Sequence, residues 1–138
     1  MHRRLLVLVP LLALAACRDT PRENAAPDPD EGDCGAYVVT NADEDGPPDR
    51  SEKQQCLLDA FAAGERVRLD VELPTVEGDP IYYRYTVVGP QLVEVRTDTT
   101  HDAFGPRAVV TERCTSLTVS NGYLTTEGCT SRQLPRGR

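Results

Sequence analysis

Residues 67–73 read Val-Arg-Leu-Asp-Val-Glu-Leu, so apolar and charged side chains alternate through the whole stretch. Successive side chains of a β-strand point to opposite faces of its sheet, and this alternation therefore predicts a strand with one buried and one solvated face. Residues 81–87 repeat the pattern, and residues 92–97 form a third candidate strand. Turn residues separate the three segments, at 74–80 and at Gly89-Pro90. The sequence therefore predicts an antiparallel β meander.

A helix is predicted immediately before this meander, over residues 51–63. Ser51 and Gln54 have the spacing of a capping box, in which the two side chains bond backbone amides at the start of a helix. Gly64 stands where a helix commonly ends in a left-handed residue. Four apolar positions recur at helical spacing: Cys56, Leu57, Ala60 and Phe61. We expect an α+β fold in which this helix covers one face of the sheet.

After the meander, residues 109–114 predict a strand that continues into a hairpin closed by Asn121-Gly122. This dipeptide is strongly preferred in type I′ turns. A two-residue loop here pairs residues whose numbers sum to 243, so that Cys114 lies opposite Cys129. Opposite Cα atoms lie about 4.5–5.5 Å apart, a separation that suits a disulfide. The same alternation places Leu117 on the apolar face and both cysteines on the more polar face.

The first 17 residues have the layout of a secretory signal that ends at a lipidation site. Arg3 and Arg4 precede the apolar residues 5–16, whose last members are small and lead directly into Cys17. The run is shorter than the roughly 20 apolar residues that a membrane-spanning helix needs. Leu14-Ala15-Ala16-Cys17 resembles the cleavage box of bacterial lipoproteins. This resemblance implies cleavage before Cys17 and attachment of diacylglycerol and palmitate to it, and two or three acyl chains would anchor the protein stably. The alternative is an ordinary cleaved signal followed by an unrelated cysteine.

Removal of residues 1–16 leaves a mature chain of 122 residues, which suits one domain. Basic residues fall from 15 to 13 against 22 acidic residues, so the net charge becomes −9. Phosphates repel a chain this acidic, which argues against nucleic acid as a partner. The polar residues 17–33 predict a flexible, lipid-anchored tether, residues 34–129 a disulfide-stapled domain, and residues 130–138 a loose tail. We expect this domain to be a monomer.

Four cysteines follow Cys17, and an even number in an exported chain predicts two disulfides. Because the hairpin pairs Cys114 with Cys129, Cys34 is left to pair with Cys56 and would join the helix to the segment before it. A four-cysteine zinc site is the alternative. The chain has no Cys-x-x-Cys spacing, so we expect no metal there.

Short motifs occur in a fixed order along the domain: Glu77-Gly78-Asp79-Pro80-Ile81, Asp98, Asp102-Ala103-Phe104-Gly105, Cys114 and Gly128-Cys129. This ordered set resembles a family of small bacterial lipoproteins built on a domain of unknown function. The resemblance covers roughly residues 41–129. It implies an exported, lipid-anchored domain with a C-terminal disulfide, and it implies no activity. Cys34 and Cys56 are outside the family's pattern, so the first disulfide rests on the cysteine count.

The loops of the meander carry a candidate edge for a ligand or cation, made of Glu77, Asp79, Asp98, His101 and Asp102. Alternate loops of a meander share one end of the sheet, and carboxylates gathered there suit a cation such as calcium. The competing interpretation is turn chemistry, because glycine supplies a positive φ and aspartate caps backbone amides. We expect neither a resident metal nor a cofactor.

Two further features bear on chemistry. His101 is flanked by acids that would let it transfer protons, but the chain has neither a Gly-x-Ser-x-Gly elbow nor a free cysteine outside the predicted lipidation site and disulfides. Catalysis is therefore not expected. In the aromatic segment that follows the first turn of the meander, Tyr83 and Tyr85 belong to the predicted core face. Tyr82 and Arg84 are then the exposed candidates for a contact surface.

We therefore predict an exported lipoprotein whose domain is a non-catalytic binding or interaction module at the cell envelope. Its partners would be the membrane, through the lipid at Cys17, and an envelope protein, a wall polymer or a small ligand. A small-ligand or cation-binding module at the acidic edge is the first alternative, and a small extracytoplasmic enzyme is the second. Because Arg18 follows Cys17, the lipid is expected in the outer membrane of a two-membrane cell, and otherwise on the outer face of the plasma membrane.

Overall fold

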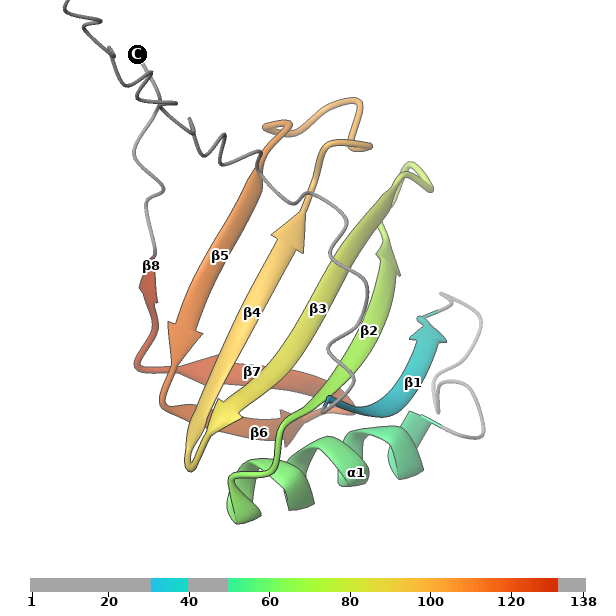
Figure 1. Cartoon of the computed structure of the whole chain (residues 1–138). Coiled ribbons are helices and arrows are strands. Elements are labelled where there is room, and N and C mark those ends of the chain that lie inside the picture. Colours follow the sequence, from blue (N-terminus) through green and yellow to red (C-terminus); the bar gives the residue numbers. More distant parts are fainter. Residues whose placement is uncertain (1–30, 40–49, 132–138) are drawn as a thin grey trace, which may run out of the picture.

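The computed structural model describes residues 31–39 and 50–131 (Figure 1). The predictions on the signal, on Cys17 and on residues 132–138 lie outside the described residues. Along the chain the elements are β1 (Gly32–Val38), α1 (Arg50–Ala63), β2 (Val67–Pro74), β3 (Pro80–Gly89), β4 (Leu92–Asp98), β5 (Val109–Cys114), β6 (Ser116–Ser120), β7 (Tyr123–Glu127) and β8 (Thr130–Ser131). Of the helices in this described part, none is long and apolar enough to cross a membrane.

Six strands form one sheet in the order β1-β2-β3-β4-β5-β8, and β6 and β7 form a separate two-stranded sheet. The predicted antiparallel meander is confirmed in β2 to β5, with Leu69 opposite Tyr85 and Tyr85 opposite Val95. β1 differs, because it lies parallel to β2. Parallel neighbours need a long crossover connection, and α1 lies within that connection. The fold is therefore α+β, with a mostly antiparallel sheet.

The hydrophobic core lies between one face of the six-stranded sheet and a layer made of α1 and the β6–β7 hairpin (Figure 1). α1 contacts β1, β2, β3 and β6, while β6 also contacts β4. Leu57 of the helix and Leu69 and Val87 of the sheet are fully buried. Burial of each such side chain contributes about 1.5–3 kcal/mol. The core consists of Cys34, Tyr37, Val39, Leu57, Ala60, Leu69, Val71, Tyr85, Val87, Val93, Val95, Cys114 and Leu117.

α1 starts one residue before the predicted start and ends at Ala63 as predicted. Gly64 follows with a φ of 73°, the left-handed conformation expected at a helix end. The predicted capping box is wrong, because Ser51 lies inside the helix and the Gln54 amide bonds groups outside it. Gln54 is instead buried on the same stripe of the helix as Leu57. The spacing of Ser51 and Gln54 suggested a cap, whereas the packing buries the Gln54 amide between other elements.

The predicted hairpin register is confirmed, with Val119 opposite Leu124. Asn121 and Gly122 have φ values of 51° and 76°, as a type I′ turn requires. The prediction that the hairpin continues the meander is wrong, because β6 and β7 leave the large sheet. Cys114 and Leu117 are both buried although they are three residues apart, which the alternation of an unbroken strand forbids. The chain therefore bends between them.

This bend also corrects the position of the second disulfide. Cys114 lies opposite Val93 on the core face of the sheet and is fully buried, whereas both cysteines were predicted on the polar face. Cys129 is exposed. Both predicted disulfides, Cys34–Cys56 and Cys114–Cys129, are present. Two disulfides fit a protein that resides outside the reducing cytoplasm, and each contributes about 2–4 kcal/mol.

Ordered structure extends slightly beyond the predicted bounds of the domain. β1 begins at Gly32, before Cys34, and Asp33 pairs with Arg68 at 3.0 Å. Hydrogen bonds from the Gly35 amide and from Arg68 lower the pKa of Asp33 below its usual value. At the other end, β8 pairs with β5 after Cys129. The domain thus uses the last residues of the predicted tether and the first residues of the predicted tail.

Candidate functional site

The second face of the six-stranded sheet points away from α1, and we call it the open face. Its side chains are half-buried or exposed, in contrast to those of the core face. They occupy alternate positions of β2, β3 and β4: Arg68, Asp70, Glu72, Tyr82, Arg84, Thr86, Glu94, Arg96 and Asp98. Seven of these nine side chains are charged at neutral pH. The open face is therefore a charged surface presented by rigid strands.

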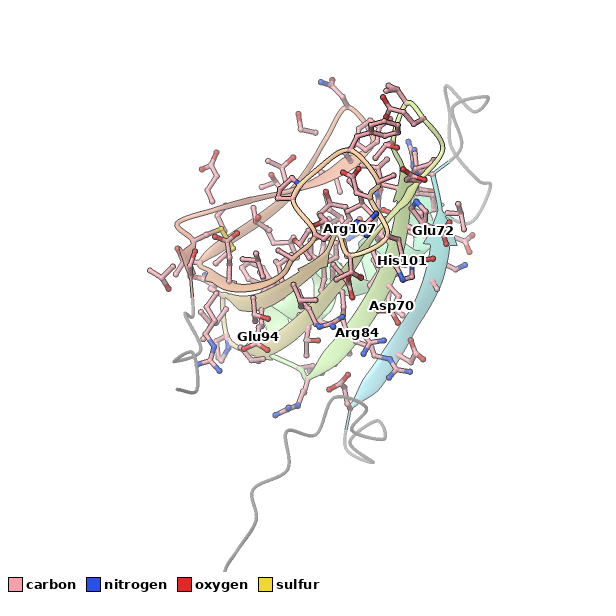
Figure 2. The ribbon with its side chains drawn as sticks, turned by 90° about the horizontal axis from the view of Figure 1, so that it is seen from above. Asp70, Glu72, Arg84, Glu94, His101 and Arg107 are labelled. Carbon is pink, nitrogen blue, oxygen red and sulfur yellow. A yellow bond between two sulfur atoms is a disulfide. The ribbon has the colours of Figure 1, made fainter. Side chains whose placement is uncertain are left out.

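The register of β2, β3 and β4 arranges the side chains of the open face in rows that run across the strands. One row contains Asp70, Arg84 and Arg96, and its neighbour contains Glu72, Tyr82 and Asp98. Figure 2 shows Asp70, Glu72 and Arg84 on the same side of the sheet. Neighbours within a row have Cβ atoms about 4.5–5.5 Å apart, so their side chains interact directly.

Arg84 and Arg96 lie directly opposite each other, and such a pair of like charges is unfavourable. Each has an acidic partner. Arg84 donates to both carboxylate oxygens of Asp70, from Nε at 2.7 Å and from Nη2 at 3.2 Å. Arg96 Nη2 lies 3.4 Å from Asp98 Oδ2. The hydrogen bonds to Asp70 raise the pKa of Arg84 above its usual value. Both guanidinium charges are therefore compensated within the sheet.

A groove of about 460 Å³ lies on the open face above these rows. Its polar lining comes from Asp70, Glu72, Tyr82, Arg84, Arg96 and Asp98, and Ala36 and Val38 of β1 form one side. Small-molecule sites typically have volumes of about 300–1,000 Å³ and combine apolar walls with a few placed polar groups. The groove therefore has the size and the lining of a site for a small ligand.

The β4–β5 loop lies at one end of the groove. Its His101 ring packs edge-on against the Tyr82 ring, with centroids 5.7 Å apart and an interplanar angle of 83°. Figure 2, which looks onto this end of the sheet, shows His101 on the same side as Glu72. The contact fixes the position of the exposed Tyr82 side chain. The loop thus contacts a residue of the groove lining.

The predicted acidic edge is partly assembled, because the two loops do meet. Ala103 N, in the β4–β5 loop, donates to Asp79 Oδ2 in the β2–β3 loop at 3.0 Å. Asp102 Oδ1 accepts hydrogen bonds from Phe104 N at 2.9 Å and from Gly105 N at 2.8 Å. These bonds are the turn chemistry that was the competing interpretation. Glu77 is exposed at the neighbouring turn.

Asp98 is engaged in the same way. Its Oδ1 accepts from Thr100 Oγ1 at 2.6 Å and from Thr100 N at 3.0 Å. These two hydrogen bonds lower the pKa of Asp98 below its usual value. Across residues 31–39 and 50–131, no group of three or more His, Cys, Asp or Glu side chains is arranged to hold a metal ion. Asp79, Asp98 and Asp102 thus accept hydrogen bonds that hold the loops in shape.

The predicted burial pattern of the aromatic segment is confirmed, and its role as a contact surface stays a prediction. Tyr85 is buried and Tyr83 half-buried, while Tyr82 and Arg84 are exposed. The sequence interpretation did not connect this exposed pair with Glu72 and its neighbours on the adjacent strands. The structure makes this connection through the register of β2 and β3, in which Glu72 lies opposite Tyr82.

No family model matches this chain, and neither does any curated protein or solved structure. The resemblance to small bacterial lipoproteins therefore stays a prediction.

Proposed function

We propose that this protein is an exported, lipid-anchored binding module of the cell envelope, and that its domain binds a small ligand in the groove of the open face without catalysing a reaction. One observation carries the proposal: within residues 31–39 and 50–131, α1 and the β6–β7 hairpin pack on one face of the sheet, and the other face holds a groove of about 460 Å³ with charged, aromatic and apolar walls. Strands that are fixed by a packed core and two disulfides hold such a site in a constant shape.

The envelope location rests on two independent features. Two disulfides fit an oxidising compartment, and the N-terminal sequence through Cys17 has the pattern of a lipoprotein signal. The tether and the lipid would place the groove beside the membrane surface. In a two-membrane cell, the arginine after Cys17 favours the outer membrane.

We favour binding over catalysis in the groove, because the acid–base candidates predicted from the sequence are already engaged in contacts of the fold. General acid–base chemistry needs a titratable group within hydrogen-bond reach of a reacting atom. In the described part of the chain, the ring of His101 contacts Tyr82, and Asp98 and Asp102 accept hydrogen bonds from their own loop. The groove is also preferred to the acidic edge, where the oxygens of Asp79 and Asp102 bond backbone amides.

The test uses a groove-filling variant. Ala36 is an exposed lining residue, so Ala36→Trp would fill the groove and leave the core unchanged. Val119→Trp, at an exposed position of the hairpin, is the matched control. Each protein is incubated with a small-molecule extract of its own source cells, desalted, and analysed by mass spectrometry for retained compounds. We expect one retained class with the wild type and Val119→Trp, and its loss with Ala36→Trp. Equal retention by all three proteins, or no retention by any, would overturn the proposal.

A further inference from the structure

Among the described residues, three carboxylates line the groove, and two of them pair with arginines. Asp70 pairs with Arg84, and Asp98 pairs with Arg96. Glu72 also lines the groove, and within residues 31–39 and 50–131 its side chain has no hydrogen bond or ion pair. The lining therefore carries one negative charge that the described part of the domain does not neutralise. A ligand of complementary charge is a monocation.

The groups beside Glu72 indicate which kind of cation fits. Tyr82 lies directly opposite Glu72 on β3, and its ring is held by the His101 ring. An aromatic ring next to a carboxylate suits an ammonium or guanidinium group, which the ring attracts through its quadrupole and the carboxylate through charge-assisted hydrogen bonds. A bare metal ion would need several oxygen ligands, and no such group is assembled in the described residues.

The other side of Glu72 is apolar. Val38 of β1 lies opposite Glu72 in the register, and 45% of its surface is exposed. Ala36, two residues earlier, lies opposite Asp70 and also lines the groove. An aliphatic chain would pack along these two side chains. The groove is therefore amphipathic, with a charged and an apolar side.

We propose that the groove binds an organic cation, with its ammonium or guanidinium group between the Glu72 carboxylate and the Tyr82 ring and its aliphatic chain along β1. This inference rests on the proposed function and gives the ligand its chemical class. Arg84 and Arg96 lie one row away, and Asp70 and Asp98 compensate their charges. A primary amine and a guanidine share this chemistry, and two probes distinguish them.

The test titrates the full chain carrying Cys17→Ser, which removes the predicted lipid, at about 150 mM salt. The probes are n-pentylammonium, propylguanidinium and the neutral 1-pentanol, and binding is followed through backbone amide shifts of Val38, Glu72 and Tyr82. We expect saturable shifts with at least one cation and none with the alcohol. Whichever cation binds more tightly identifies the preferred head group. Similar shifts with the alcohol, or no saturable shift with either cation, would overturn the proposal.

Four variants assign the binding to the two groups. Glu72→Gln keeps the shape of the side chain and removes its charge, and we expect at least a tenfold weaker affinity. Tyr82→Leu should weaken binding severalfold, whereas Tyr82→Phe keeps the ring and should bind like the wild type. Glu65→Gln removes an exposed charge at the end of α1 and controls for the overall acidity of the chain. If Glu72→Gln and Glu65→Gln weakened the affinity equally, the loss would come from the change in net charge and not from the groove. If the wild type retained an uncharged compound in the extract experiment, the proposal of a cationic ligand would be wrong, while the proposal of a binding function would stand.

Discussion

The side-chain amide of Gln54 donates a hydrogen bond of 2.9 Å to the backbone oxygen of Gly122, which lies 68 residues further along the chain. The same nitrogen donates to the Tyr37 hydroxyl at 3.0 Å. Burial raises the pKa of Tyr37, so this hydroxyl is neutral and accepts the bond. One buried amide thus joins α1 to β1 and to the turn of the hairpin.

Replacement of Gln54 by Leu should cost about 1–3 kcal/mol of unfolding free energy, because it leaves buried polar groups without their partner. Denaturant unfolding followed by circular dichroism measures this cost. Gln55→Leu is the matched control on the next position of the helix, where the exposed amide bonds Asp59 on the same helix. We expect a change below about 0.5 kcal/mol for the control. Equal stabilities of the two variants would show that the amide does not join the elements.

Gly122 is constrained by its backbone and by its surroundings. Its φ is 76°, and an added Cβ would meet the guanidinium of Arg50, which also lies over the Tyr123 ring. Gly122→Ala should therefore destabilise the protein by about 1–3 kcal/mol. Gly78→Ala is the control, since Gly78 has a φ of 91° and open space around its Cα. The excess loss at Gly122 over Gly78, measured by thermal unfolding, includes the cost of displacing the Arg50 guanidinium, and no excess would show that this side chain moves aside freely.

Local signals predicted the parts of the fold that depend on neighbouring residues. Alternation from residue 67 gave the meander, and Asn121-Gly122 gave the hairpin register and the Cys114 pairing. The parallel direction of β1 was not predictable, because a short apolar segment around Tyr37 carries no information on direction. The bend between Cys114 and Leu117 was also missed, since strand alternation assumes an unbroken strand and packing decides where the strand leaves the sheet.

The candidate site was likewise predictable from the sequence only in part. Tyr82 and Arg84 were predicted as an exposed pair because alternation assigns their face directly. Glu72 was not connected with them, since its importance depends on which acids of neighbouring strands pair with arginines. Pairings such as Arg96 with Asp98 are set by side-chain geometry, which a single sequence does not specify.

Acid should weaken the fold through Asp98. Its folded-state pKa is below the usual value because Thr100 donates two hydrogen bonds to it. The unfolded chain therefore takes up the proton first, and the stabilisation, present above the unfolded pKa, is lost as the pH falls through the folded one. Unfolding free energies measured from pH 7 down to pH 2 should fall more steeply for the wild type than for Asp98→Asn. Glu77→Gln removes an exposed carboxylate and controls for the change in net charge. Parallel curves for all three proteins would contradict the assignment.

The Cys34–Cys56 disulfide should support the groove as well as the fold. It ties β1 to α1, and β1 supplies the apolar side of the groove through Ala36 and Val38. The double variant Cys34→Ser with Cys56→Ser should lose about 2–4 kcal/mol of stability. It should also weaken binding in the groove, because the edge strand loses its covalent link to the helix. Cys17→Ser, outside the predicted domain, should change neither quantity. Unfolding and ligand titration of the same preparations test both effects, and an unchanged affinity would show that pairing with β2 alone holds β1.

Membrane attachment should depend on Cys17 alone. The predicted signal places the acyl chains on this residue, and the mature chain is too acidic to bind anionic lipid head groups by charge. Fractionation of cells that produce Cys17→Ser should therefore move the protein from the membrane to the soluble exported fraction, and mass spectrometry should show the loss of lipid. Cys129→Ser is a control that keeps the signal intact and should stay in the membrane fraction. If Cys17→Ser stays bound to membranes as the wild type does, an acyl anchor at this position is excluded.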